Sequence, residues 1–170
     1  MNKKLRLLVT KTCNRKCEGC CNKQFDLDAV PKINAANAAK YELVMLTGGE
    51  PMLYTTILTY LIKYIKAVHN KPKVYVYTAK CDDLQEFLKV LRIADGITLT
   101  LHERDDVAPF LKLADTLTSY PNLVEGKSMR LHIFKEVGLK YDNPMWKIKP
   151  DMEWIEYCPV PADEDFRVLD

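Results

Sequence analysis

Stretches with the pattern of buried strands alternate with stretches that repeat apolar residues at helical spacing along most of this 170-residue chain. Parallel strands need a crossover connection, usually a helix, so this alternation favours βαβ units with right-handed crossovers. The sequence therefore predicts an α/β fold of about five to six βα units in one domain, residues 1–170. We expect strands at 5–9, 43–46, 73–77, 96–101 and 129–134, helices at 33–41, 54–68, 82–93 and 107–117, and strand pieces at 146–148 and 152–155 divided by Pro150.

Two polar loops follow the first two expected strands. Residues 10–25 form a loop rich in Cys, Lys and Asn, and the run Thr-Gly-Gly-Glu-Pro occupies residues 47–51. Functional residues in parallel α/β folds gather at the carboxyl ends of the strands. We therefore expect both loops to lie at the same edge of the sheet.

Cys13, Cys17 and Cys20 have the spacing CxxxCxxC. Three thiolates can hold three irons of a cubane [4Fe–4S] cluster and leave the fourth iron open, whereas a structural cluster normally has four cysteines. A zinc loop is the alternative, and it would require further ligands such as Cys81, Cys158 or His132.

Taken together, the cysteine motif and residues 47–51 resemble the radical S-adenosylmethionine (radical SAM) superfamily over the first third of the chain. The resemblance implies a partial parallel (β/α) barrel. It also implies that the open iron binds S-adenosylmethionine. One electron from the cluster then cleaves the sulfonium and releases a 5′-deoxyadenosyl radical, which abstracts hydrogen from a substrate.

Gly48, Gly49 and Glu50 resemble the family segment that holds the methionine ammonium group. Glycine would let that group approach the backbone and would permit unusual dihedral angles. Glu50 would balance the charge of the ammonium group.

Polar residues at the later strand ends are candidates for contacts to the ribose and the methionine carboxylate. In the family, polar side chains at the ends of the fourth and fifth strands often hold these groups. We expect His102, Thr100 and Thr78 to do so here, while Arg130 and His132 share one face of their strand.

Gly19 departs from the family pattern, because many members carry an aromatic residue there that packs on the adenine. The backbone or a neighbour such as Phe25 would have to supply that contact. We expect Trp146 and Trp154 to close the core, and lining a substrate pocket is the alternative role.

The other cysteines are not expected to hold a cluster. Cys21 adjoins Cys20, and adjacent side chains diverge, so a packing role or a spare thiol is expected. A structural role is expected for Cys81, and Cys158 is isolated. Clustered cysteines favour metal binding over disulfides and therefore a reducing, cytoplasmic setting.

Charge and hydropathy narrow the range of possible binding partners. The net charge of +2 gives no reason to expect nucleic acid as an obligate partner, and no apolar run is long enough to span a membrane. Residues 3–23 are basic and residues 151–170 are acidic. A basic rim would dock an acidic electron donor such as flavodoxin or ferredoxin, or it is solvated surface.

The sequence leaves the substrate open. Residues 17–22 are similar to the small activases of anaerobic ribonucleotide reductase, whose substrate is a partner protein. A 7-carboxy-7-deazaguanine synthase is a second candidate, and a non-catalytic iron–sulfur or zinc-binding module is an alternative of another class.

Overall fold

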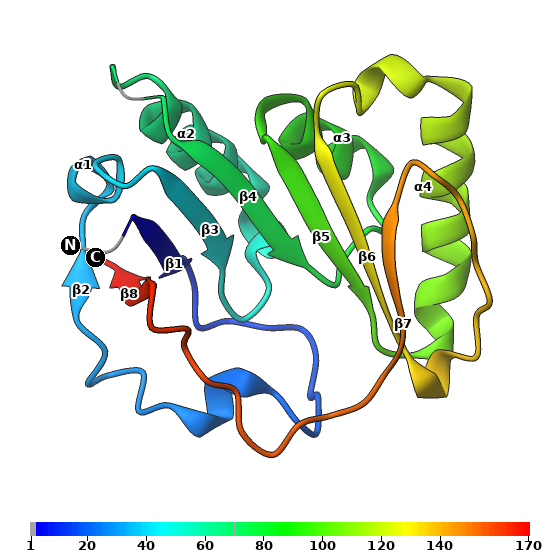
Figure 1. The fold of residues 1–170 in the computed structure, drawn as a ribbon, viewed down its shortest axis with the longest axis horizontal. Helices are drawn as coiled ribbons and strands as arrows, with labels where there is room; N and C mark the ends of the chain where they lie inside the picture. Colours follow the sequence, from blue (N-terminus) through cyan, green and yellow to red (C-terminus); the bar gives the residue numbers. More distant parts are fainter. Residues whose placement is uncertain (1–2, 70) are drawn as a thin grey trace.

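A single parallel sheet of eight strands forms the frame of the molecule (Figure 1). The computed structural model describes residues 3–69 and 71–170. The strand order is β2-β8-β1-β3-β4-β5-β6-β7, every pairing is parallel, and the sheet is not closed, as in a partial parallel barrel. The strands are β1 (Lys4–Leu8), β2 (Lys32–Ile33), β3 (Leu43–Thr47), β4 (Lys73–Thr78), β5 (Gly96–Leu101), β6 (Ser128–Phe134), β7 (Lys147–Met152) and β8 (Glu164–Leu169).

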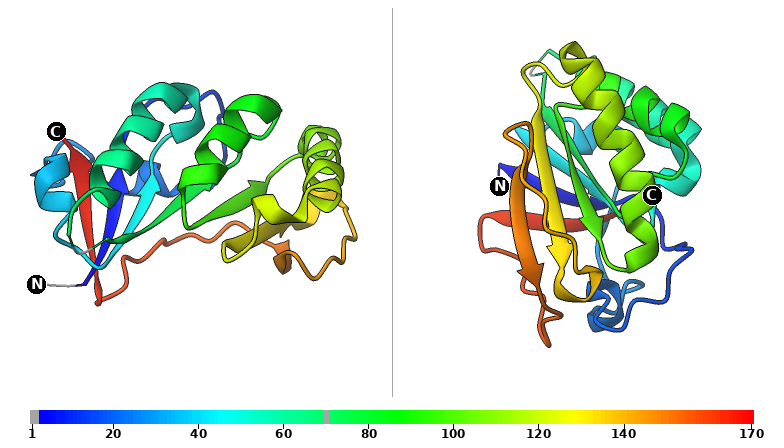
Figure 2. Two further views of the ribbon diagram at one scale, coloured as in Figure 1. Left: turned by 90° about the horizontal axis from the view of Figure 1, so that it is seen from above. Right: turned by 90° about the vertical axis from the view of Figure 1, so that its right-hand side faces the viewer.

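The three longer helices cover one face of this sheet, as Figure 2 shows. The α-helices are α1 (Ala35–Ala38), α2 (Thr55–Lys66), α3 (Leu84–Ile93) and α4 (Val107–Ser119). Short 3₁₀ turns are η1 (Cys21–Gln24), η2 (Pro51–Tyr54), η3 (Arg104–Asp106), η4 (Pro121–Leu123) and η5 (Lys135–Val137). Within the described residues, no helix is long and apolar enough to cross a membrane.

Local sequence explains why the helices begin and pack as they do. The Asp83 side chain caps α3 by accepting a hydrogen bond from the backbone N–H of Glu86 at 3.0 Å. Pro109 lies in the first turn of α4, where its missing N–H is not needed. The apolar face of each helix then packs on the sheet.

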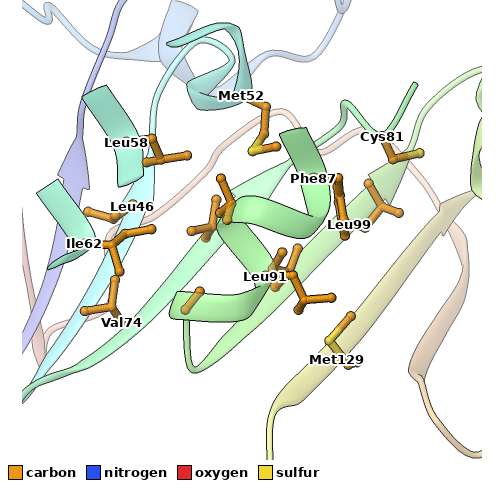
Figure 3. Close-up of a cluster of buried hydrophobic side chains, with 14 of the residues drawn as sticks. Leu46, Met52, Leu58, Ile62, Val74, Cys81, Phe87, Leu91, Leu99 and Met129 are labelled. Atoms are coloured by element: carbon orange, nitrogen blue, oxygen red, sulfur yellow. The ribbon is translucent and has the colours of Figure 1, made fainter. Parts of the chain in front are cut away.

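Figure 3 shows the resulting core between the helices and the sheet. Phe87 of α3 and Leu99 of β5 are both fully buried, and Ile62 of α2 packs into the same cluster. Trp146 is also buried there, against Phe110 of α4, as the sequence predicted. Burial alternates along β4 and β6, because helices cover one face of the sheet and the other face is more open.

Two local expectations were wrong, and the last strand was not foreseen. Helix α1 covers only Ala35–Ala38 instead of residues 33–41. Strand β7 continues through Pro150 and ends at Met152, because an edge strand tolerates a proline on its free side. The acidic C-terminal residues form β8, which inserts between β1 and β2.

Two isoleucines on α2 give a matched test of this packing. Ile62 is 0 % exposed, whereas Ile57 is 59 % exposed. Ile62→Ala should lower the free energy of unfolding by about 2–5 kcal/mol because it leaves a cavity. Ile57→Ala should change it by about 0.5 kcal/mol or less. Urea unfolding of the metal-free protein measures both, and equal losses would contradict the assigned core.

Candidate functional site

A cavity of about 810 Å³ opens at the carboxyl ends of the strands, on the face that the helices leave bare. Its walls come from the loop after β1, the turn after β3, the ends of β4 to β7, and the chain that follows β7. Its volume lies within the range of about 300–1,000 Å³ that small-molecule sites occupy. All of the site residues predicted from sequence line it: Cys13, Cys17, Cys20, Gly48, Gly49, Glu50, Thr78, Thr100 and His102.

Backbone hydrogen bonds join the cysteine loop to the glycine turn. The N–H of Gly49 donates to the carbonyl of Thr10 at 2.7 Å, and the N–H of Glu50 donates to the carbonyl of Thr12 at 2.8 Å. These bonds extend the pairing of β1 with β3 beyond the strand ends. They place the start of the cysteine loop directly against the glycine turn.

This close approach explains why positions 48 and 49 are glycine. It also corrects the expectation that these glycines adopt unusual dihedral angles. A Cβ on Gly49 would lie 2.1 Å from the carbonyl oxygen of Thr12, and one on Gly48 would lie 2.6 Å from that of Thr10. Neither glycine has a positive φ, so unusual dihedral angles are not their role. The glycines are needed because two backbones touch there.

The three thiols of the CxxxCxxC motif share this cavity. Cys13 is exposed, while Cys17 and Cys20 are half-buried. Burial raises the pKa of the Cys17 thiol, and the nearby Cys20 and Cys13 raise that pKa further. The backbone N–H of Arg15 donates to the sulfur of Cys13 at 3.4 Å.

These thiols are not packed together as ligands of a single ion. Among the described residues, no three His, Cys, Asp or Glu side chains are gathered closely enough to hold one metal ion. A cubane cluster places each thiolate on a different iron, so its ligands stand farther apart than the ligands of a zinc ion. Separate thiols around one cavity fit the cluster better than they fit zinc.

A buried ion pair between Arg15 and Asp106 anchors the cysteine loop to the far side of the cavity. The Arg15 guanidinium donates to both carboxylate oxygens of Asp106, one at 3.0 Å, and to the carbonyl of Ala79 at 2.8 Å. Asp106, which is 7 % exposed, also accepts the N–H groups of His102 and Glu103. The bidentate geometry fixes the direction in which the loop runs.

The Glu50 carboxylate is 2 % exposed and points inward. It accepts hydrogen bonds from the Met52 N–H at 2.9 Å, the Thr78 hydroxyl at 2.6 Å and the Ala79 N–H at 2.9 Å. Desolvation raises its pKa, and these donors act against that rise. A carboxylate has about four acceptor positions, so one remains for a ligand.

His102 has an unsatisfied polar atom in the cavity wall. Its Nδ1 is buried and has no hydrogen-bond partner. Burial lowers the pKa of His102 to about 4, and the charge of Arg15 lowers it too. The imidazole is therefore neutral at pH 7.

An aromatic side chain does lie at Gly19, but it comes from the other end of the chain. A Cβ on Gly19 would be 2.8 Å from the ring of Trp154, and that ring stacks on His102 with centroids 5.1 Å apart. Trp154 is partly buried, packs against the core and also lines the cavity, so both roles expected for it are seen. Phe25 instead packs against Phe166 of β8, away from the cavity lining.

The expectations for Cys21 and Cys158 were wrong. The two residues form a disulfide although they are 137 positions apart, because β8 brings the end of the chain back beside the cysteine loop. Cys81 lies in the apolar core, in agreement with a structural role, and burial raises its pKa to about 12.

Sequence reasoning also missed the roles of Arg15 and Asp106 and the contact of Trp154 with Gly19. Arg15 and Asp106 looked like ordinary surface charges, and only the pairing of distant loops makes them partners. Gly19 was the one available signal for Trp154, since a missing side chain inside a motif leaves room for another group.

Comparison with known proteins supports iron–sulfur binding. Residues 4–108, more than half of the chain, match the sequence model of a family described as a 4Fe-4S single cluster domain. That domain family is found in radical SAM proteins. No protein of curated function matches the chain.

The anchoring of the cysteine loop can be tested with Asp106→Asn. This change keeps the shape but leaves the Arg15 guanidinium half-paired, so the free energy of unfolding should fall by about 3 kcal/mol. Asp105→Asn alters the exposed neighbour and should have little effect. Urea unfolding of metal-free protein compares them, and similar stabilities would show that the ion pair does not anchor the loop.

The lowered pKa of His102 predicts a pH dependence of stability. The imidazole takes up its proton near pH 6.5 in the unfolded chain but only near pH 4 in the folded protein. Its contribution to the free energy of unfolding is therefore fully present above pH 6.5 and is lost as the pH falls toward 4. His102→Gln should weaken this acid sensitivity in metal-free protein. His69→Gln, at an exposed position, should leave it intact, and an unchanged profile for His102→Gln would contradict the assignment.

Proposed function

The chain belongs to the 4Fe-4S single cluster domain family, and from this premise we propose that it is a radical SAM enzyme. Cys13, Cys17 and Cys20 would hold a [4Fe–4S] cluster whose fourth iron binds S-adenosylmethionine. The observation that carries the proposal is the shared cavity, where the three thiols face the turn at residues 48–50 and the polar strand ends.

The remaining cysteines support an open iron. Cys21 and Cys158 are joined to each other, and Cys81 is buried in the core outside the cavity lining. None of these three offers a fourth thiolate to a cluster in this structure. One iron would then be left for an external ligand.

A cluster held by Cys13, Cys17 and Cys20 would supply the one electron needed to cleave the sulfonium of S-adenosylmethionine, so that hydrogen could be abstracted from a substrate. The chain itself binds and orients the ligand. The turn at residues 48–50 would receive the ammonium group, with the free acceptor position of Glu50 turned toward it. Arg15 lies close enough to Glu50 to lower its pKa, which favours the charged carboxylate there.

Polar and aromatic groups on the opposite wall suit the nucleoside. The unpartnered Nδ1 of neutral His102 and the hydroxyl of Thr100 would bind the ribose or the methionine carboxylate. Trp154 would replace the aromatic residue that Gly19 lacks, with its ring beside the adenine. Thr78 donates to Glu50 and so positions that carboxylate for the ligand.

Beyond the nucleoside, the cavity wall carries charges of both signs. Lys149, Asp151 and Glu153 line this part and are exposed, which suits a polar substrate. Along the chain, exposed Cys13 lies between the exposed Lys11 and Lys16, and Lys11 also pairs with Asp28. Charge complementarity would dock an acidic one-electron carrier of the flavodoxin or ferredoxin type on this rim.

Cleavage of S-adenosylmethionine tests the function directly. Anaerobic reconstitution with iron and sulfide, followed by dithionite and S-adenosylmethionine, should produce 5′-deoxyadenosine, measured by chromatography. Cys17→Ala should lose the cluster absorbance and essentially all product, because one iron loses its thiolate.

Cys81→Ala is the matched control and should retain both the cluster and the product. A reconstituted cluster whose electron paramagnetic resonance spectrum is unmoved by S-adenosylmethionine would favour a non-catalytic iron–sulfur module. Zinc binding without any cluster would overturn the proposal.

A further inference from the structure

The segment between β7 and β8 crosses the cavity without regular secondary structure. This segment, residues 153–163, is called the strap here. Figures 1 and 2 show it on the face of the sheet opposite the helices, passing beside the loop that follows β1. Glu153, Trp154, Ile155 and Cys158 of the strap line the cavity, so the strap forms one of its walls.

Few contacts other than the disulfide hold the strap to the cysteine loop. The Gln24 side chain accepts the N–H of Cys158 at 2.7 Å and donates to the carbonyl of Ile155 at 3.5 Å. Trp154 lies on Gly19. Single hydrogen bonds of this kind contribute little net stability each. The Cys21–Cys158 bond is therefore the strongest link between the two segments in the described part of the chain.

The disulfide is placed where it can be reduced. Cys21 is exposed, whereas Cys158 is 4 % exposed. Both line the same cavity as three free thiols, and Cys20 adjoins Cys21. A thiolate must reach one sulfur of a disulfide to exchange with it, and exposed disulfides are the labile ones.

We propose that Cys21 and Cys158 are a redox-active pair that controls access to the cavity. A dithiol reductant attacks the exposed Cys21 sulfur and forms a mixed disulfide, while Cys158 leaves as a thiolate and takes a proton. The second thiol of the reductant then releases Cys21. Two electrons and two protons pass to the protein, and the reductant leaves as its own disulfide.

Reduction would loosen the strap. The Gln24 and Trp154 contacts would then be the remaining links to the cysteine loop, while Lys135 and Lys4 still pair with Glu153 and Asp163 at the two ends of the strap. Trp154 could then move away from Gly19. Oxidation would lock the strap over the cavity. The redox couple itself does not depend on the proposed function, whereas the effect on ligand binding rests on the proposed function.

The first measurement follows the couple by thiol mapping. Metal-free protein is equilibrated anaerobically in buffers of varied dithiothreitol ratio, then alkylated, digested and analysed by mass spectrometry. Cys21 and Cys158 should change from disulfide to alkylated thiol together, in one two-electron transition. Cys81 should remain a thiol throughout. Pairing of Cys21 with another cysteine, or two free thiols under oxidising conditions, would overturn the proposal.

The second measurement follows the strap through Trp154. In a Trp146→Phe background Trp154 is the only tryptophan, and acrylamide quenching of its fluorescence should rise several-fold on reduction. With Cys158→Ser added, quenching should be high under both conditions. With Cys81→Ser added, the parent response should be kept. Equal quenching of the parent in both redox states would show that the disulfide does not hold the strap.

The third measurement adds S-adenosylhomocysteine, which the cluster cannot cleave, to reconstituted protein. Binding should be faster after reduction in the parent and equally fast in both states of Cys158→Ser. Equal rates in the two states of the parent would overturn the gating role. Absence of binding in either state would count against the proposed function and against gating, while thiol mapping would still decide the redox couple.

Discussion

Two backbone hydrogen bonds, from Gly49 to Thr10 and from Glu50 to Thr12, hold together the parts on which the site depends. They exist because β1 and β3 are neighbours in a parallel sheet and their following loops leave the same edge. The glycines allow the two backbones to meet. As a result, the cysteine loop begins beside the turn that carries Glu50, and the thiols face the cavity that this turn lines.

A second set of contacts extends this junction across the sheet. The backbone of Ala79, just after β4, donates its N–H to Glu50 and offers its carbonyl to Arg15. The Arg15 guanidinium in turn donates a hydrogen bond to Asp106 at the start of α4. Opposite charges therefore alternate from Glu50 through Arg15 to Asp106, and each buried charge has a partner. Such pairing is required where water is largely excluded.

The return of the chain as β8 gives the site its last wall. β8 lies beside β1, where Arg6 pairs with Glu164 at 2.8 Å, and the Tyr41 hydroxyl donates to Asp165 at 2.6 Å. A basic residue near the start of the chain therefore pairs with an acidic residue near its end, within the fold itself. Because β7 and β8 lie on opposite sides of the sheet order, the connection between them must cross the cavity, which brings Trp154 to Gly19 and Cys158 to Cys21.

The sequence by itself determined the alternation of strands and helices, the parallel sheet, and the common location of Cys13, Cys17, Cys20 and the turn at residues 48–50. The strands and helices follow from local periodicity, which short windows of sequence contain. The common location of the loops follows from the rule that loops after parallel strands leave the same edge of the sheet. Only the tertiary structure decided the partners of Arg15 and Cys21, the aromatic group at Gly19 and the placement of β8. Each of these joins residues far apart in the chain, and no local pattern encodes which distant segment will lie beside another.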